Sequence, residues 1–403
     1  MNICHTFAKK TATLLLLITI FAGLPLNAAD KKYSITKKTY KTLALSRELM
    51  DQSSYQNALA KLNTLLTKVT GNRYETALVH QHLAYVYLEQ ENYIKALHAL
   101  EKTLTYADTL PVDTVQSVRY NLAQTATRAE RFKIAEKSLN QWFVEAAKPP
   151  ADAWYLRGLV HYKQQQLKPA ATYLKRAIAL SHHENWSILL LTIYLDLKQY
   201  TQATKILTQL IEYYPHKKEY WLNLTDVYLM RQDYPHALST LQLAQLSIDL
   251  NEQEILKLAS LYLHNNTPYN AATLLTTAIK KQRIKNTAQN LETLANSWAM
   301  AREPEKELNS LKQAIRIKPS GKLYLRSAQI LLHKERWQEA ILMLNRALKN
   351  KVKNPGQVYL LKGIAAYQDK KMQTAKAAFI QATKYNKSKK QANNWLQQLN
   401  QQQ

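Results

Sequence analysis

Residues 225–244, TDVYLMRQDYPHALSTLQLA, contain the pattern that decides the fold. Tyr234 is followed after two spacers by Ala237, the modest-sized Thr225 lies twelve positions before that alanine, and Ala244 lies seven positions after it. The pattern recurs at intervals of 33 to 39 residues, and Glu307 takes the place of the anchor alanine in one degenerate copy. The anchors of the other copies are Ala58, Ala96, Ala135, Ala170, Ala203, Ala237, Ala271, Ala340 and Ala375. A period of this length is the signature of stacked helical repeats.

Small residues twelve positions before the anchors indicate that each copy is a helix–turn–helix unit. A small side chain lets the partner helix approach closely, and the bulky residues beside it fill the remaining space. Each pair keeps an apolar face that only a neighbouring pair can bury. The prolines agree: they fall near the expected starts of second helices, at Pro169, Pro235, Pro268 and Pro304, or near their ends, at Pro215 and Pro319. We therefore expect an all-α solenoid of about ten units.

Both ends of the chain depart from the repeat. Residues 1–29 combine Lys9 and Lys10, an apolar run over 11–24 and a small-residue stretch, which is the pattern of a secretory signal peptide. We expect cleavage after Ala28 or Ala29, and favour it over an uncleaved anchor because the apolar run is shorter than the roughly 20 residues of a spanning helix. Residues 30–38 are expected to form a mobile basic arm, residues 39–387 the repeats, and residues 388–403 a capping helix with a polar tail.

Composition excludes several classes of protein. The 403 residues are 46% hydrophobic and 21% charged, enough for a sizeable core, but the length exceeds the usual single-core size of about 250 to 300 residues. Six glycines argue against folds that need many residues at positive φ and against glycine-rich phosphate loops. The single cysteine, Cys4, lies in the predicted signal peptide, so the exported chain has no thiol for a disulfide, a metal site or a nucleophile.

The charge is strongly positive and uneven. There are 55 Lys and Arg against 29 Asp and Glu, a formal net charge of +26. Residues 286–403 contain 21 basic and 7 acidic residues, so the C-terminal third is the more basic part. For an exported chain, an anionic membrane face, peptidoglycan or an acidic protein fits this charge better than nucleic acid, which we do not expect as a partner. The alternative is that the lysines simply solvate the surface.

The sequence offers no motif for catalysis. It has no GxSxG, phosphate-binding loop or dinucleotide fingerprint. The histidine pairs His80 and His82, and His182 and His183, lack a nearby third ligand in a metal-binding frame, and the second pair is expected to close a turn. We therefore predict no catalytic residue, cofactor or metal site, and no enzymatic activity.

A repeat scaffold does offer a surface lined by the first helix of every pair. Tyr85, Tyr120 and Tyr155 are expected to hold the same place in three consecutive units and to form a ladder along this groove. Tyrosine combines apolar area with a hydroxyl at low entropic cost, which suits an extended peptide. The alternative is that these rings only pack between units. The candidate groove residues are Tyr85, Tyr120, Gln124, Tyr155, Tyr162, Asp196 and Asp226.

The repeat resembles the tetratricopeptide repeat, a helix–turn–helix unit of 34 residues, from Thr39 to about Lys387. This resemblance implies a right-handed superhelical solenoid that binds other proteins. The joints carry a closer likeness: ENWSILLLTIYLDLKQY (184–200), YYPHKKEYWLNLTDVYL (213–229) and TAQNLETLANSWAMARE (287–303). They resemble the periplasmic tetratricopeptide proteins of proteobacteria that are encoded beside TonB-type energy-transducing systems. That resemblance implies a non-enzymatic periplasmic accessory of such a system, with no catalytic residues.

Three functions follow in order of preference. The first is a periplasmic scaffold that binds a protein segment in its groove, as a component of a TonB-type transport system. The second is an accessory of envelope biogenesis or polysaccharide export. The third, and least favoured, is an enzyme acting on the cell wall, because no paired-carboxylate or nucleophile motif is present.

Overall fold

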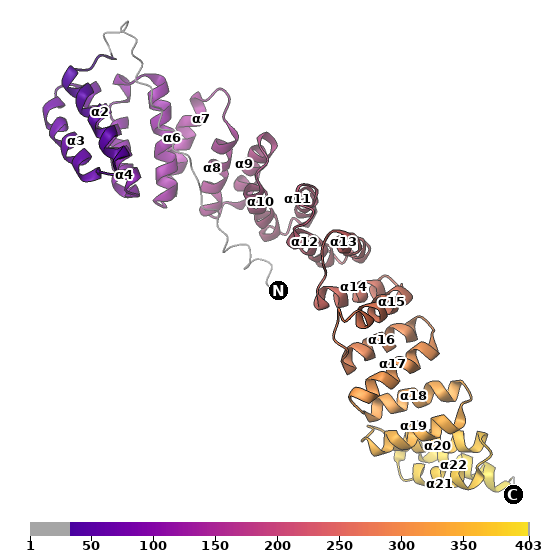
Figure 1. The fold of residues 1–403 in the computed structure, drawn as a ribbon. Helices are drawn as coiled ribbons and strands as arrows, with labels where there is room; N and C mark the ends of the chain where they lie inside the picture. The colour runs from indigo at the N-terminus through magenta and orange to yellow at the C-terminus, as the bar shows by residue number, and fades with distance from the viewer. Residues whose placement is uncertain (1–32, 402–403) are drawn as a thin grey trace. The chain divides into compact units, whose positions relative to one another are not determined.

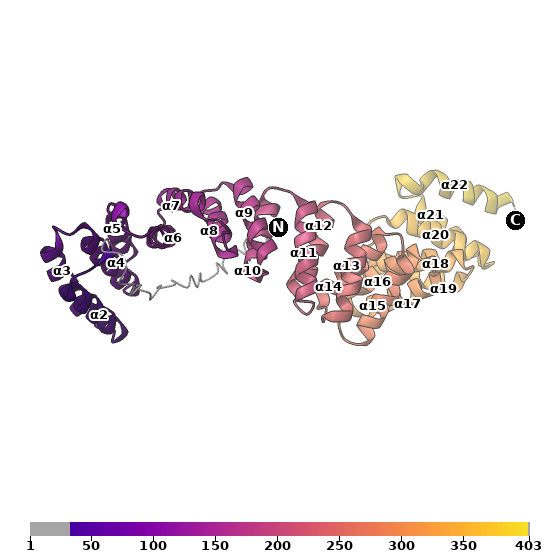
Figure 2. The same ribbon diagram turned by 90° about the horizontal axis from the view of Figure 1, so that it is seen from above.

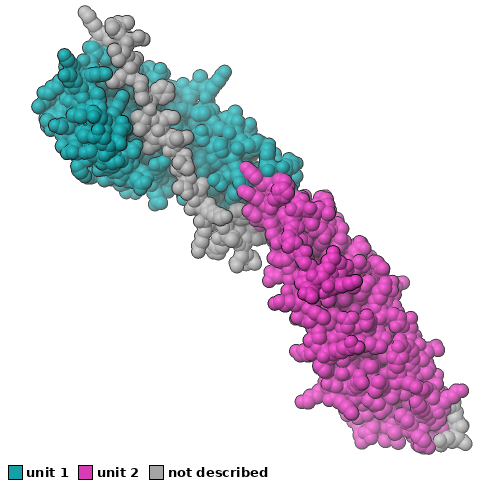
Figure 3. All heavy atoms as spheres, in the orientation of Figure 1, with its two compact units in different colours: residues 1–213 teal, residues 214–403 magenta. Residues whose placement is uncertain are grey.

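The structure is a computed structural model that describes residues 33–401. The predicted signal peptide, residues 1–29, lies outside the described part. Contacts divide the chain into two compact units, unit 1 up to Tyr213 and unit 2 from Tyr214 onward (Figure 3). Each unit is a row of helices in which neighbouring pairs pack on each other (Figure 1). The described residues are helical and contain no strand, which confirms the all-α prediction.

Within residues 33–401, ten antiparallel pairs account for all α-helices but the last, and we name the two members of each pair the first and the second helix. In unit 1 the pairs are α2 (Lys37–Asp51) with α3 (Tyr55–Val69), α4 (Arg73–Glu89) with α5 (Tyr93–Leu104), α6 (Val112–Arg128) with α7 (Phe132–Glu145), α8 (Ala151–Lys163) with α9 (Leu167–Leu180), and α10 (Glu184–Asp196) with α11 (Tyr200–Tyr213). A short 3-10 helix, η2 (Ala107–Thr109), precedes α6.

Unit 2 continues the same order (Figure 2). Its pairs are α12 (Lys218–Met230) with α13 (Tyr234–Ser247), α14 (Glu252–His264) with α15 (Pro268–Lys280), α16 (Ala288–Met300) with α17 (Pro304–Ile317), α18 (Gly321–His333) with α19 (Trp337–Lys349), and α20 (Pro355–Gln368) with α21 (Met372–Ala382). The last helix, α22 (Asn386–Gln401), covers the end of the stack.

The anchor alanines explain the close packing inside each pair. All nine are fully buried near the start of a second helix. The opposing small residues leave no spare room: a Cβ on Gly363 would lie 2.4 Å from the ring of Phe379, and one on Gly158 would lie 2.8 Å from Leu174. Glu307 takes the same place in α17 and is also buried. The period therefore marks the tightest helix–helix contact of each unit.

The turn inside each pair has a residue at positive φ, although the chain contains few glycines. In the turn after α8, the Gln166 N–H donates to the His161 carbonyl and the Gln165 N–H donates to the Tyr162 carbonyl, both at 2.9 Å. The same two bonds close all ten turns, a Schellman arrangement that requires positive φ at one residue. None of these residues is glycine: they are Ser53, Glu91, Glu130, Gln165, Lys198, Gln232, Asn266, Arg302, Glu335 and Lys370. A shortage of glycine thus did not signal a shortage of positive-φ positions.

The terminal segments also differ from the prediction. Thr36 caps α2 with its side chain, so Lys37 and Lys38 belong to the first helix and not to a basic arm. The Thr36 N–H donates to Glu75 Oε1 at 2.5 Å, which ties the chain before α2 to α4. At the other end α22 starts at Asn386, two residues earlier than predicted, and stacks Trp395 on Phe379 at 5.5 Å. Within the described residues, no helix is both long and apolar enough to cross a membrane.

Candidate functional site

The candidate site is the face that the first helices of unit 1 form together, which we name the first-helix face. Tyr120 and Tyr155 occupy equivalent places, fifteen residues before the anchors of their units. Tyr85 lies only eleven residues before its anchor, one helical turn further along α4, where the next unit has Gln124. The expected ladder of three equivalent tyrosines is therefore wrong for Tyr85.

Tyr85 is the centre of a buried polar cluster. Its hydroxyl accepts a hydrogen bond from Gln81 Nε2 at 2.7 Å and also interacts with Asn121 on α6. Burial raises the pKa of Tyr85, although these hydrogen bonds and the nearby Arg47 guanidinium act in the opposite direction. The hydroxyl is therefore neutral and its hydrogen bonds join α4 to α6.

His82 completes this cluster beneath Tyr85. Its Nδ1 lies 2.9 Å from the Leu78 carbonyl, so it carries the proton and donates it, and Nε2 is a buried nitrogen without a hydrogen-bond partner. The pKa of His82 is lowered to about 4, chiefly by burial and also by the charge of Arg47, while the hydrogen bond to Leu78 acts in the opposite direction. The ring is neutral at neutral pH, and protonating it would place a second charge beside Arg47.

Tyr120 joins α6 to the next first helix. Burial raises the pKa of Tyr120 to about 12, and the carboxylate of Asp152 at the start of α8 adds to that shift. Its hydroxyl also interacts with Gln124 one turn along α6, and its ring packs on Trp142 at 5.1 Å. This tyrosine is half-buried. It therefore presents a neutral hydroxyl next to a carboxylate.

Tyr155 belongs to the core between two first helices. Its ring stacks on Trp186 of α10 with centroids 4.8 Å apart and planes 12° from parallel. The ring of His183 also lies 4.1 Å from that of Trp186, in the turn that the histidine pair was expected to close. Burial raises the pKa of Tyr155 to about 12. The stack fixes the spacing of α8 and α10 and leaves little of the ring for a ligand.

Tyr162 and Asp196 are the more accessible members of the set. Tyr162 is half-buried near the end of α8, and burial and the Asp196 carboxylate raise the pKa of its hydroxyl. Asp196 is exposed at the end of α10. A neutral donor and a carboxylate thus lie next to each other where solvent and a ligand reach them.

Exposure separates the predicted residues into two groups. Tyr85, Gln124 and Tyr155 are 9%, 5% and 7% exposed, because the first helices pack directly on one another. These three side chains pack between neighbouring helices, as the alternative interpretation expected. Replacing them therefore tests folding more than binding. Tyr120, Tyr162 and Asp196 line the surface. Sequence reasoning missed Asn121, Asp152 and Trp186, whose only signal was a place on consecutive first helices.

Asp226 lies in unit 2 and has a different environment. Its carboxylate pairs with Lys257 Nζ of α14 at 2.7 Å, so it joins two first helices of that unit. The first helices of unit 2 present half-buried leucines where unit 1 presents Tyr120, Tyr155 and Tyr162. These leucines are Leu222, Leu229, Leu256, Leu263, Leu325 and Leu332. At these places α6 and α8 of unit 1 therefore have tyrosines, and α12, α14 and α18 of unit 2 have leucines.

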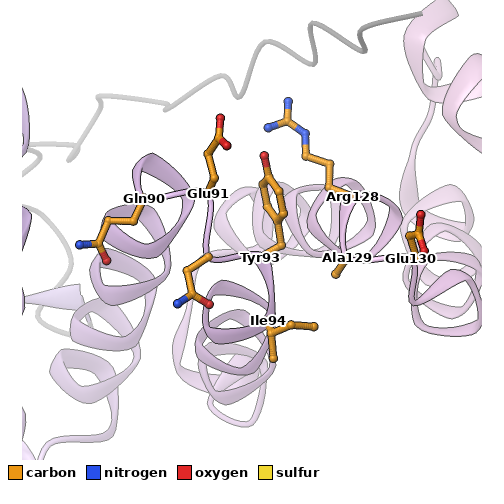
Figure 4. A pocket seen from close by; sticks show the side chains of 8 residues that line it. Gln90, Glu91, Tyr93, Ile94, Arg128, Ala129 and Glu130 are labelled. Atoms are coloured by element: carbon orange, nitrogen blue, oxygen red, sulfur yellow. The ribbon is translucent and has the colours of Figure 1, made fainter. Parts of the chain in front are cut away.

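One hollow of about 540 Å³ lies at the turn edge of unit 1 (Figure 4). It is lined by two neighbouring turns, residues 90–94 and 128–130. The Arg128 guanidinium lies 5.7 Å from the centre of the Tyr93 ring, and the two side chains point the same way. The hollow opens widely to solvent and contains none of the predicted groove residues. Among residues 33–401, no group of three His, Cys, Asp or Glu side chains is placed to hold a metal ion.

Comparison with known proteins identifies the repeat. A family model described as tetratricopeptide repeat matches residues 120–183 and 189–250. The sequence matches none of the curated proteins.

Solved structures of repeat proteins are similar at low identity. A tetratricopeptide repeat protein from Parabacteroides merdae is 16% identical, with a TM-score of 0.40, over 65% of this chain and 99% of that one. The C-terminal part of a repeat protein from Cytophaga hutchinsonii is 14% identical, with a TM-score of 0.39, over 69% and 95%. YrrB, described as having an unusual peptide-binding site, is 15% identical, with a TM-score of 0.34, over 50% and 99%.

Proposed function

Because this chain is a tetratricopeptide-repeat protein, we propose that it is a scaffold that binds an extended segment of a partner protein along its first-helix face. The observation that carries the proposal is the row of neutral hydroxyls and carboxylates on consecutive first helices, from Tyr120 and Asp152 to Tyr162 and Asp196. A peptide backbone needs both donors and acceptors at regular spacing, and this row supplies both. The scaffold acts by binding and not by catalysis.

The partner segment that fits this face is polar or mixed in character and carries at least one donor for Asp196. Tyrosine rings supply contact area with few rotatable bonds, so little entropy is lost when a peptide is held. The half-buried leucines of unit 2 suit an apolar stretch of a partner. The hydroxyls and carboxylates of unit 1 suit a polar stretch instead.

We further propose that the protein is exported to the periplasm and serves a TonB-type energy-transducing system. The signal-peptide pattern of residues 1–29 supports export, and the likeness of the joints at 184–200, 213–229 and 287–303 supports the TonB association. N-terminal sequencing of the protein from the periplasmic fraction should start at Ala29 or Asp30. A chain that starts at Met1 or stays with the cytoplasm contradicts this part of the proposal.

Site-specific cross-linking tests the groove. A photo-crosslinking amino acid in place of Tyr162 should trap a partner in living cells, and the same amino acid in place of the exposed Tyr213 on the second helix α11 should not. TonB-type motor components at position 162 support the proposal, whereas envelope-synthesis subunits support the alternative. Equal products at both positions refute the groove assignment.

Substitutions of surface residues give a second test. Tyr162→Ala with Asp196→Ala should lower affinity for the trapped segment at least about 10-fold, as expected for residues near the centre of an interface. Helicity should be unchanged, because neither side chain belongs to the core. Tyr213→Ala is the matched control. Unchanged binding by the double variant shows that the partner uses another surface.

A further inference from the structure

In the last four helix pairs of unit 2, one edge carries charge of a single sign. The turns that follow the second helices α15, α17, α19 and α21, over residues 280–285, 316–322, 346–353 and 384–390, contain fifteen basic and no acidic residues. We name these four turns the basic edge. All fifteen side chains are exposed: Lys280, Lys281, Arg283, Lys285, Arg316, Lys318, Lys322, Arg346, Lys349, Lys351, Lys353, Lys384, Lys387, Lys389 and Lys390.

Contacts between the turns show that they line the same side of the stack. The Gly321 N–H donates to the Asn350 carbonyl at 3.2 Å, which joins the turn after α17 to the turn after α19. A Cβ on Gly356 would lie 2.5 Å from the Cβ of Tyr385, so the start of α20 touches the turn after α21. The turns after α17, α19 and α21 therefore lie side by side, and their cations form one strip.

The opposite edge of the same pairs is balanced. The turns inside these four pairs, residues 264–268, 300–306, 333–339 and 368–372, contain six Lys and Arg and five Asp and Glu residues. Many of them pair with one another, as Arg336 does with Glu305 and Glu339, and Lys371 with Asp369. On the basic edge, the ion pairs between described residues involve only Arg283 and Lys322. A general lysine bias would not sort charge in this way.

Helix termini do not explain the strip either. Cations are favoured at helix C-termini, so some lysines are expected wherever a second helix ends. The equivalent turns of the first six pairs provide the comparison, because each also connects the end of a second helix to the next first helix. Residues 68–73, 102–108, 145–151, 180–184, 212–219 and 247–254 contain six basic and eight acidic residues. The excess of cations is therefore specific to the last four turns.

The chemistry of the strip fits a lipid surface better than a soluble polyanion. Twelve of the fifteen cations are lysines, which act as point charges, whereas bidentate recognition of single phosphates favours arginine. Apolar side chains lie among them: Ile317 is 50% exposed and Tyr385 is 37% exposed. Aliphatic and tyrosine side chains enter the interfacial region of a bilayer, where basic residues attract anionic headgroups.

We propose that the basic edge docks the protein onto an anionic phospholipid bilayer, in addition to any partner on the first-helix face. The strip lies on the turns of unit 2, and the proposed groove residues lie on first helices of unit 1. Docking through the edge therefore occupies none of the proposed groove residues.

Vesicle binding tests the proposal on the full chain. Wild-type protein should bind mixed phosphatidylglycerol and phosphatidylcholine vesicles far more strongly than phosphatidylcholine alone. Raising the salt from about 0.05 M to 0.5 M should release it, because screening shortens the range of surface charges. Every variant keeps the same N-terminal residues, so differences between variants report on the edge.

Two variants with the same change in net charge locate the contact. The edge variant replaces Lys318, Lys349, Lys353 and Lys387 with Gln, and we expect a loss of vesicle affinity of roughly 600-fold, from about five-fold for each of the four cations. The control variant replaces four exposed lysines on second helices of unit 1, Lys133, Lys137, Lys175 and Lys205, with Gln and should stay within about three-fold of wild type. Equal losses in both variants overturn the proposal.

A third variant separates a bilayer from a soluble polyanion. Ile317→Ser with Tyr385→Ser should weaken vesicle binding while leaving heparin binding unchanged. Heparin binding without vesicle binding contradicts the bilayer, and so does failure to bind anionic vesicles. The Tyr162→Ala, Asp196→Ala variant should bind vesicles like wild type. Partner binding tests the first-helix face and vesicle binding tests the basic edge, so the failure of one proposal is distinguishable from the failure of the other.

Discussion

The buried ion pair at the degenerate anchor makes the sharpest prediction. In α17 Glu307 stands where nine other units have a fully buried alanine, and its side chain is 11% exposed. Arg326 of α18 covers it, with Nε 2.7 Å and the nearer terminal nitrogen 2.6 Å from Oε1. The same guanidinium also donates to Asn296 of α16. This pair therefore joins three helices of unit 2.

Arg326→Ala should destabilise this region by about 3 kcal/mol, because it leaves an almost fully buried carboxylate without its partner. Glu307→Ala should change stability by less than about 1 kcal/mol, since alanine is the residue that packs at this place in the other units and Arg326, 26% exposed, retains water and Asn296. The double variant should resemble Glu307→Ala, apart from the lost packing of the arginine stem.

Native-state hydrogen exchange of the α17 amides is the assay, because a repeat stack opens locally and a single melting temperature averages over units. A loss of about 3 kcal/mol corresponds to exchange about 100-fold faster. Amides of α5 in unit 1 serve as the internal control. Equal effects of the two single variants, or additive effects in the double variant, would refute this account of the pair.

Three further predictions concern turns, packing and pH. Gln165→Gly should stabilise the turn after α8 by about 0.5 to 1 kcal/mol in urea unfolding, because it removes the strain of positive φ. Gly363→Ala should destabilise by about 1 to 3 kcal/mol, because its Cβ overlaps Phe379, whereas Gly71→Ala, with open space around it, should be neutral in the same assay. His82 has a folded pKa of about 4 against 6.5 unfolded, so the unfolded chain binds its proton first and stability falls as pH drops from about 6.5 to 4, by roughly 3 kcal/mol. Urea midpoints measured against pH should show a smaller fall for His82→Phe, and an identical pH dependence would contradict the assignment.

The repeat itself was predictable because its causes are local. Ala237, Thr225 and Tyr234 lie within about a dozen residues of one another, and their sizes decide how closely two consecutive helices approach. The prolines mark helix ends for equally local reasons: Pro268 and Pro304 begin α15 and α17, where a missing N–H removes no helical bond. Sequence therefore determined the number, length and order of the helices.

The site depends on contacts between neighbouring helix pairs, and no local sequence pattern describes such contacts. Tyr120 and Tyr155 occupy equivalent positions, yet only Tyr155 meets a tryptophan from the next first helix and becomes core. The buried Glu307 finds its partner in the same way, in Arg326 nineteen residues later. Net charge was readable from composition, but the contact that brings the basic turns after α17 and α19 together belongs to the tertiary structure. Sequence by itself thus determined the repeated helix pair. Only the tertiary structure decided which side chains each pair buries and which it exposes.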